Sequence, residues 1–282
     1  MKRIRRVAAL IAAVAVATGL SAAALTPGAS AHTASPATKA TGPKPTIVLV
    51  HGAWADASGW TPVIERLEEA GYPVDAPPNP LRGLTYDSEY IASVLKQIEG
   101  PIVLVGHSYG GAVITNAAEG DSNVKALVYI AAWALGKGQS LASLSAMPVA
   151  ACTPSVPTIA TTYPEPGGGT GTELTINPAK YSYTFLDNEL PAYEAQAMAA
   201  EQRPLSLDAI TETSGTPAWR TIPSWYMVAT RDHAICPNLE RFMAAQAHAH
   251  TVQVSGPHLI MVTNPGPVTS LIEQAADATT GR

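Results

Sequence analysis

Ile102-Val103-Leu104-Val105 runs directly into Gly106-His107-Ser108-Tyr109-Gly110, and this stretch decides the fold. A short, continuous run of β-branched residues and leucine is typical of a strand buried on both faces of a parallel sheet. The Gly-x-Ser-x-Gly pattern that follows opens a helical segment over residues 111–118. This strand–turn–helix setting holds a serine in a strained turn with its hydroxyl exposed, so Ser108 is the candidate nucleophile. The alternative is a glycine-rich turn in which the serine is incidental.

Strand patterns and helix patterns alternate along the rest of the chain. Buried-strand patterns lie at residues 46–50, 102–105, 126–130, 225–229 and 251–254, and a further short strand near residues 72–76 fits the spacing. Helical patterns lie at residues 60–70, 87–99, 111–118, 239–247 and 267–277. This alternation predicts an α/β fold with a doubly wound, mostly parallel sheet of about six strands.

One long stretch, residues 134–217, breaks the alternation. It contains proline- and glycine-rich loops at residues 161–171 and one helical segment at residues 191–202, without a clear buried strand. Insertions of this size between sheet strands are usually functional. We expect a cap over the carboxyl edge of the sheet, where open α/β sheets bind ligands.

The N-terminus has the pattern of an export signal. Met1–Arg6 is basic, residues 7–25 are apolar, and Ala29-Ser30-Ala31 matches a small-residue cleavage site. We predict a signal peptide cleaved after Ala31, a flexible leader over residues 32–44 and a secreted body over residues 45–282, leaving no stable membrane insertion after cleavage. The alternative is a membrane anchor, since the apolar stretch approaches the ~20 residues that span a bilayer. Sec and twin-arginine export both remain open.

Composition and charge favour a globular domain and exclude two classes of partner. Hydrophobic residues make up 46% of the chain and charged residues 14%. Without the four basic residues of the signal peptide, 13 basic residues face 22 acidic ones. This acidic balance argues against nucleic acid, whose phosphates require clustered Lys and Arg, and against anionic membrane surfaces.

The chain has two cysteines, Cys152 and Cys236. In an oxidising compartment an even, small number of cysteines predicts a disulfide, and only one intramolecular pairing is possible. The alternative is a pair of buried free thiols.

A serine nucleophile needs a base, and the base needs an orienting acid. On this scaffold the expected chain order is Ser, then Asp or Glu, then His. Asp232 follows the strand pattern at 225–229 and His258 follows the one at 251–254, which places both at the same sheet edge as Ser108. Three carboxylates of the cap remain rivals for the acid: Asp187, Asp208 and Glu212.

The other histidines of the body are assigned to structural or solvent-exposed positions. His248 and His250 lie near a helix end, and His233 is expected to face away from the nucleophile. His51 and His107 are expected to hydrogen-bond or pack around the loops that carry them. The spacing of the histidines matches no metal-ligand motif, so no metal is expected.

The loop after the first strand, His51-Gly52-Ala53-Trp54, is the candidate oxyanion loop. One backbone N–H comes from such a loop and a second from the residue after the nucleophile, which assigns the pair to Ala53 and Tyr109. Trp54, Trp133 and Trp219 could line an apolar substrate pocket under the cap, with core packing as the alternative.

Three motifs carry a resemblance to a known family: Val48-Leu49-Val50-His51-Gly52-Ala53-Trp54, residues 105–111 around Ser108, and Ser255-Gly256-Pro257-His258. The chain resembles the α/β-hydrolase superfamily and is similar to its compact branch of plant methyl-ester esterases, hydroxynitrile lyases and bacterial relatives. The resemblance implies a Ser108–Asp232–His258 triad, Ala53 and Tyr109 as oxyanion donors, and no cofactor.

Departures from the family patterns narrow the chemistry. A serine at position 108 excludes the dehalogenases and epoxide hydrolases of this fold, which carry Asp there. Leu259 follows the histidine where the similar hydroxynitrile lyases carry Lys, which argues against that reaction. Ala229 stands three residues before the candidate acid, where relatives often have Gly.

These observations predict a secreted serine hydrolase that cleaves a small or medium carboxylic ester or lactone through an acyl-enzyme. The expected partner is therefore a small-molecule ester, and the sequence does not indicate an oligomeric state. Two alternatives remain: a cofactor-free perhydrolase of the non-haem haloperoxidase type, which uses the same triad with peroxide in place of water, and a ligand-binding member of the fold with slow turnover.

Overall fold

The computed structural model describes residues 43–148 and 156–280. The predicted signal peptide, the leader up to residue 42 and Cys152 lie outside these residues. Among the helices that are described, none is long and apolar enough to cross a membrane.

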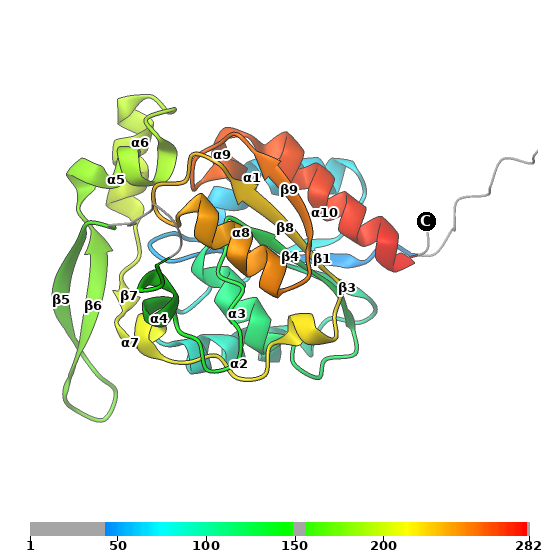
Figure 1. Cartoon of the computed structure of the whole chain (residues 1–282), viewed down its shortest axis with the longest axis horizontal. Coiled ribbons are helices and arrows are strands. Elements are labelled where there is room, and N and C mark those ends of the chain that lie inside the picture. Colours follow the sequence, from blue (N-terminus) through cyan, green and yellow to red (C-terminus); the bar gives the residue numbers. More distant parts are fainter. Residues whose placement is uncertain (1–42, 149–155, 281–282) are drawn as a thin grey trace, which may run out of the picture. The chain divides into compact units, whose positions relative to one another are not determined.

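A six-stranded sheet forms the centre of the body (Figure 1). Its strands follow the spatial order β2-β1-β3-β4-β8-β9, and every neighbouring pair is parallel. The strands are β1 (Thr46–Val50), β2 (Val74–Asp75), β3 (Ile102–His107), β4 (Val124–Ile130), β8 (Ser224–Ala229) and β9 (His250–Val254). The predicted doubly wound sheet and all six of its strands are therefore confirmed.

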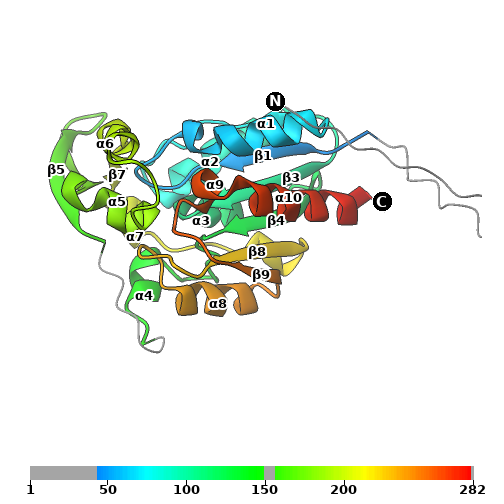
Figure 2. The same ribbon diagram turned by 90° about the horizontal axis from the view of Figure 1, so that it is seen from above.

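Helices cover both faces of this sheet (Figure 2). Side chains of α2 (Leu84–Leu95), α3 (Tyr109–Ala117) and α8 (Pro237–Gln246) pack in one hydrophobic cluster. Side chains of α1 (Thr61–Glu69), α9 (Ile260–Thr263) and α10 (Pro265–Thr280) pack in a second cluster. Alternate residues of β1 enter the two clusters, Val48 and Val50 the first, Ile47 and Leu49 the second. Burial on both faces explains the continuous apolar runs in the sequence.

The second helix begins earlier than its sequence pattern indicates. Helix α2 starts at Leu84 and ends at Leu95, whereas the pattern predicts residues 87–99. Asp87 belongs to the first turn of the helix, where its carboxylate accepts the backbone N–H of Arg82 at 3.0 Å. An acidic residue within the first turn stabilises the N-terminal end of a helix, so Asp87 does not mark the beginning of α2.

An insertion between β4 and β8 contains a second, smaller sheet, which the sequence did not predict. It comprises α4 (Leu141–Ser145), β5 (Thr158–Pro164), β6 (Thr170–Ile176), α5 (Pro178–Leu186), α6 (Ala192–Glu201), β7 (Leu205–Ser206), α7 (Asp208–Thr211) and the 3-10 helix η2 (Ala218–Arg220). Strands β5, β6 and β7 form an antiparallel sheet, and Figure 1 shows β5 and β6 as a long hairpin. Residues 161–164 and 170–171, predicted as loops, are therefore strand, whereas residues 165–169 form the turn between the two strands. Most of β5 is exposed, so the hairpin has no buried apolar run by which to recognise it.

Candidate active site

Ser108 occupies a strained turn between β3 and α3. Its backbone has φ 52° and ψ −125°, a region that residues with a Cβ rarely adopt. The turn is possible because glycines stand on both sides of it. A Cβ on Gly106 would lie 2.6 Å from the carbonyl oxygen of Gly110, and a Cβ on Gly110 would lie 2.4 Å from that of Val50. The Gly-x-Ser-x-Gly pattern is thus a requirement of backbone packing at this turn.

The structure brings Ser108, His258 and Asp232 together at the carboxyl ends of β3, β9 and β8. The Ser108 Oγ lies 2.9 Å from the His258 Nε2, and the His258 Nδ1 lies 2.5 Å from the Asp232 Oδ2. All three side chains are buried. The geometry is that of a nucleophile, a base and an orienting acid.

Backbone donors hold the Asp232 carboxylate in place. Its Oδ1 accepts the N–H groups of Ala234 at 2.6 Å and Ile235 at 2.8 Å. Because Oδ1 is occupied by two donors, Oδ2 is the oxygen left for His258. The loop thus presents one specific oxygen to the histidine.

The three rival carboxylates of the cap lie elsewhere. Asp187 contacts Arg231 and His233, and Glu212 accepts the backbone N–H of Thr85 at 2.7 Å. Asp208 is exposed at the start of α7. Among the four candidates, Asp232 is the one that the structure places against His258.

The candidate oxyanion donors border the same pocket as the serine. Tyr109 is the first residue of α3, where backbone N–H groups have no intrahelical acceptor and the helix dipole favours negative charge. Ala53 lies in the loop after β1, and both residues line the pocket with Ser108. The Tyr109 ring is anchored by its hydroxyl, which donates to the Asp87 Oδ2 at 2.7 Å. Burial raises the pKa of the Asp87 carboxyl. This anchor was not predicted from the sequence.

His51 supports the oxyanion loop, as predicted. Its Nε2 accepts the backbone N–H of Asn79 at 2.9 Å, so the proton resides on Nδ1, which donates to the Gly52 carbonyl at 2.9 Å. The Asn79 side chain donates back to the His51 carbonyl at 3.1 Å. Burial lowers the pKa of His51 to about 4. Both ring nitrogens are therefore committed to holding the loop.

His107 packs against His258 and contacts its backbone. Its Nε2 lies 3.0 Å from the His258 carbonyl oxygen, and the two rings are 4.7 Å apart. Burial lowers the pKa of His107 well below its usual value, so the ring is neutral. It packs against Trp60 on its other side, with 6.3 Å between the ring centres.

The remaining histidines do not contact Ser108 in the described structure. His233 pairs with Asp187 at 3.0 Å and stacks on Tyr183, while His248 and His250 are exposed. Their positions agree with the sequence analysis. No group of three or more potential metal ligands occurs among the described residues.

Replacing His51 with Gln should remove part of the acid sensitivity of the fold. Unfolded His51 takes a proton as the pH falls through 6.5, whereas folded His51 stays neutral until about 4. Between these two pH values the unfolded state binds more protons than the folded state. The free energy of unfolding therefore decreases as the pH is lowered through this window, by up to about 3 kcal/mol for this group. Urea unfolding at neutral pH and near pH 5 should show a smaller loss for His51→Gln than for the wild type. Equal losses of unfolding free energy in the two proteins would contradict the buried, neutral state assigned to His51.

The pocket above the triad is small and mainly apolar. Its volume is about 230 Å³. Its lining combines candidate catalytic residues with side chains of the insertion: Ala53, Trp54, Ser108, Tyr109, Trp133, Leu141, Ser145, Val156, Thr158, Leu174, Leu205, Ile210, Ala234, Ile235 and His258. A larger hollow of about 690 Å³ runs along α2 and α3, but no triad residue lines it. The smaller pocket is therefore the candidate substrate site.

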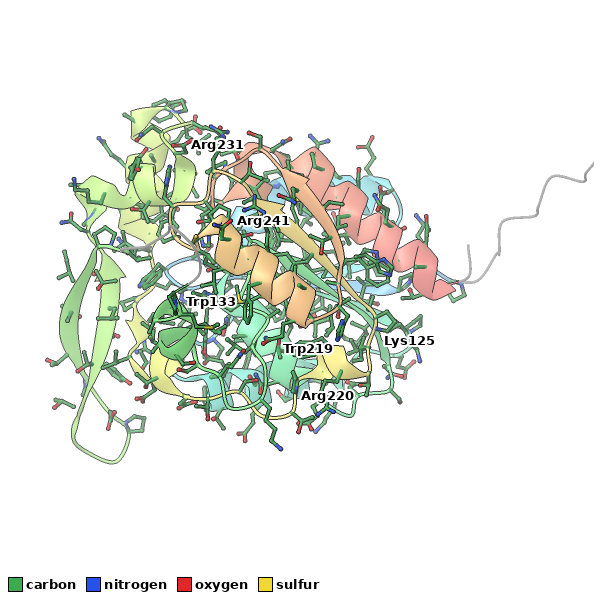
Figure 3. All side chains as sticks on the ribbon, viewed as in Figure 1. Lys125, Trp133, Trp219, Arg220, Arg231 and Arg241 are labelled. Atoms are coloured by element: carbon green, nitrogen blue, oxygen red, sulfur yellow. The ribbon has the colours of Figure 1, made fainter. Side chains whose placement is uncertain are left out.

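Two of the three candidate pocket tryptophans line this pocket, and the third does not. Trp54 and Trp133 contribute to the wall. Trp219, labelled in Figure 3, is instead partly buried and packs against the first hydrophobic cluster. Its indole N–H donates to the Leu135 carbonyl at 2.9 Å. The expectation for Trp219 was wrong because the 3-10 helix that carries it returns to the body before β8.

The insertion contacts the loops of the site through residues that adjoin the candidate catalytic groups. The Trp54 indole N–H donates to the Leu174 carbonyl of β6 at 2.7 Å. The Leu259 N–H donates to the Phe185 carbonyl of α5 at 2.9 Å, and the Phe185 ring lies 5.2 Å from the His258 ring. Arg231, labelled in Figure 3, pairs with Asp187 at 2.8 Å. The insertion therefore forms part of the site.

Cys236 is buried directly before α8, and it is not a free thiol. Its expected partner, Cys152, lies outside the described residues. The disulfide between them stays a prediction.

Comparisons with known proteins agree on one family. The model of the "Alpha/beta hydrolase family" matches residues 47–270. A carbendazim hydrolyzing esterase of Nocardioides sp. (strain SG-4G) is 36% identical over 110 residues, which cover 34% of this chain and 46% of that protein. The alpha/beta hydrolase nvfD of Aspergillus novofumigatus (strain IBT 16806) is 25% identical over 256 residues, 83% of this chain and 97% of that protein.

A solved structure with the same fold is that of polyneuridine aldehyde esterase. It superposes with a TM-score of 0.71 at 20% identity, over 83% of this chain and 100% of that chain. At this identity the likeness establishes the fold.

Proposed function

Because the chain belongs to the alpha/beta hydrolase family, we propose that it is a carboxylic-ester hydrolase with Ser108 as nucleophile. Asp232 and His258 complete the triad, and the N–H groups of Ala53 and Tyr109 bind the oxyanion. The observation that carries the proposal is the 2.9 Å hydrogen bond between the Ser108 Oγ and the His258 Nε2 beside an apolar pocket.

The first half-reaction acylates the serine. His258 accepts the hydroxyl proton on Nε2 while the Ser108 Oγ attacks the ester carbonyl. The negative charge that develops on the carbonyl oxygen is stabilised by the two N–H groups. Asp232 keeps the proton of the neutral imidazole on Nδ1 and stabilises the imidazolium. Collapse of the intermediate transfers the Nε2 proton to the departing alcohol.

The second half-reaction frees the enzyme. A water molecule gives a proton to the His258 Nε2 and attacks the acyl carbonyl, and the same donors hold the oxyanion. When the intermediate collapses, the proton returns to the Ser108 Oγ and the carboxylic acid leaves. One ester and one water thus give one acid and one alcohol.

The lining of the pocket favours a neutral, compact substrate. Among its described lining residues there is no Lys, Arg, Asp or Glu, and Ser145 and Thr158 are the hydroxyl-bearing residues besides Ser108 and Tyr109. Charged groups are costly to bury without a partner. A pocket of about 230 Å³ suits a small or medium ester or lactone better than a long acyl chain.

We further propose that the enzyme is secreted and that its signal peptide is cleaved after Ala31. The support is the basic, apolar and small-residue sequence of residues 1–31. A Cys152–Cys236 disulfide would suit an oxidising compartment, and Cys236 is not a free thiol.

A series of p-nitrophenyl esters from acetyl to palmitoyl tests the proposal. We expect hydrolysis to be fastest at a short or medium acyl chain and to fall steeply for palmitoyl, because the pocket is small. A folded protein that hydrolyses no ester or lactone would contradict the proposal. Peracid formation that depends on peroxide and exceeds ester hydrolysis would favour the perhydrolase instead.

A further inference from the structure

A buried carboxyl group that the mechanism does not use lies beside the triad. Glu240 is on α8, which packs along β8 (Figure 1). Its side chain is completely inaccessible to solvent. Its Oε2 accepts the backbone N–H of Ala229 at 3.1 Å. Acidic side chains are almost never fully buried unless they are paired, so this position calls for an explanation.

Glu240 replaces a missing strand partner at the end of β8. The pairing of β4 with β8 ends at Ile130 and Met227, and the Met227 carbonyl accepts the N–H of Ala131. Alternate residues of a strand present their backbone groups to the same neighbour, so the N–H of Ala229 also faces β4, beyond the end of that pairing. A buried N–H without an acceptor is strongly destabilising. The Glu240 carboxyl provides the acceptor.

A continuous hydrogen-bonded path connects Glu240 to the nucleophile. The Ala229 carbonyl accepts the N–H of Asp232 at 3.2 Å. The Asp232 carboxylate contacts His258, which contacts Ser108. The position of Ala229 therefore affects the position of the triad acid.

The charge state of Glu240 follows from its surroundings. Burial and the neighbouring Asp232 carboxylate raise its pKa well above the usual value, against smaller opposing effects of the Ala229 N–H and of Arg241. Glu240 also acts electrostatically on the buried Tyr226, whose hydroxyl donates to the Ala132 carbonyl. The Oε1 has no hydrogen-bond partner of ordinary geometry among the described residues, although Asp232 is close enough to interact with the carboxyl. Two adjacent buried carboxyls do not both ionise, so Glu240 is the neutral one.

We propose that Glu240 is a positioning residue for Asp232, a neutral carboxylic acid that holds the end of β8 in place. The inference rests on the proposed function, because it assigns Asp232 to the triad. As a neutral group, Glu240 leaves Asp232 as the single negative charge that supports His258.

Two substitutions in the full chain test this role. Glu240→Gln keeps an acceptor for the Ala229 N–H and carries no charge, so we expect kcat and the pH profile of kcat/KM to stay within about twofold of wild type. Glu240→Leu keeps the bulk but removes the acceptor, and we expect kcat to fall about tenfold or more with a much smaller change in KM. Glu89→Leu, on an exposed position of α2, is the control.

The rate at which a fluorophosphonate labels Ser108 separates the possible outcomes. Full labelling of Glu240→Leu at the wild-type rate would overturn the positioning role alone. A large loss of kcat in Glu240→Gln, or a shift of the acid limb of its kcat/KM profile, would show that an ionised Glu240 is required. Either result would also overturn the positioning role of a neutral Glu240, whether or not Glu240→Leu folds. A folded wild type that is not labelled would overturn the proposed function, and the positioning role with it.

Discussion

Ser108→Ala is expected to reduce kcat by about five to six orders of magnitude while leaving the fold intact. The substitution removes only the Oγ, and alanine has no group that can attack the ester or give a proton to His258. The apolar pocket and the two oxyanion donors remain, so KM should change little and a small residual rate over water should persist. Steady-state hydrolysis of the best p-nitrophenyl ester, with circular dichroism as a check of folding, measures the effect.

Ser145→Ala is the matched control for this substitution. Ser145 also lines the pocket, but among the described residues the serine that is hydrogen-bonded to His258 is Ser108. It should keep kcat within a few-fold of wild type. If Ser108→Ala retained wild-type turnover, the nucleophile would lie elsewhere.

Asp232→Asn is expected to reduce kcat by about 10⁴-fold through the wrong histidine tautomer. The N–H groups of Ala234 and Ile235 both point at the Oδ1 position, so the amide oxygen must occupy that position. The amide NH₂ then faces the His258 Nδ1, which has to act as an acceptor. The imidazole proton moves to Nε2, where it faces the Ser108 Oγ and prevents general-base catalysis. The kcat of the variant, measured at neutral pH, tests this directly.

Asp208→Asn provides the comparison, because Asp208 is an exposed carboxylate of the insertion that the sequence left as a rival. Its substitution should leave kcat within about twofold of wild type. A large loss in Asp208→Asn together with a mild one in Asp232→Asn would reverse the assignment of the acid.

The central sheet could be predicted because burial dictates the pattern of its inner strands. Strands covered on two faces need continuous apolar runs, and such runs mark β1, β3, β4 and β8 in the sequence. The outer strands β2 and β9 are half-buried or exposed, and their sequences are mixed. The carboxyl ends of parallel strands share one edge, so a serine after β3, an aspartate after β8 and a histidine after β9 must be close in space. The glycines beside Ser108 follow from the close approach of Gly110 to the Val50 carbonyl.

The insertion and the supporting residues could not be predicted, for physical reasons. The β5–β6 hairpin has largely solvent-exposed or half-buried faces, so neither strand produces a clear pattern. Trp219 has the composition of a pocket residue, but its place depends on the path of the chain before β8. Glu240 looks like an ordinary polar residue of a helix. Its burial becomes evident only when β8 is seen to extend past β4.

Covalent labelling of the wild type and of Ser108→Ala with a fluorophosphonate, followed by peptide mapping, tests the central claim most directly. A serine activated by His258 should be phosphonylated in stoichiometric amount, and the modified peptide should contain Ser108. The alanine variant should remain unmodified. Labelling of the wild type at another residue, or equal labelling of both proteins, would contradict the account.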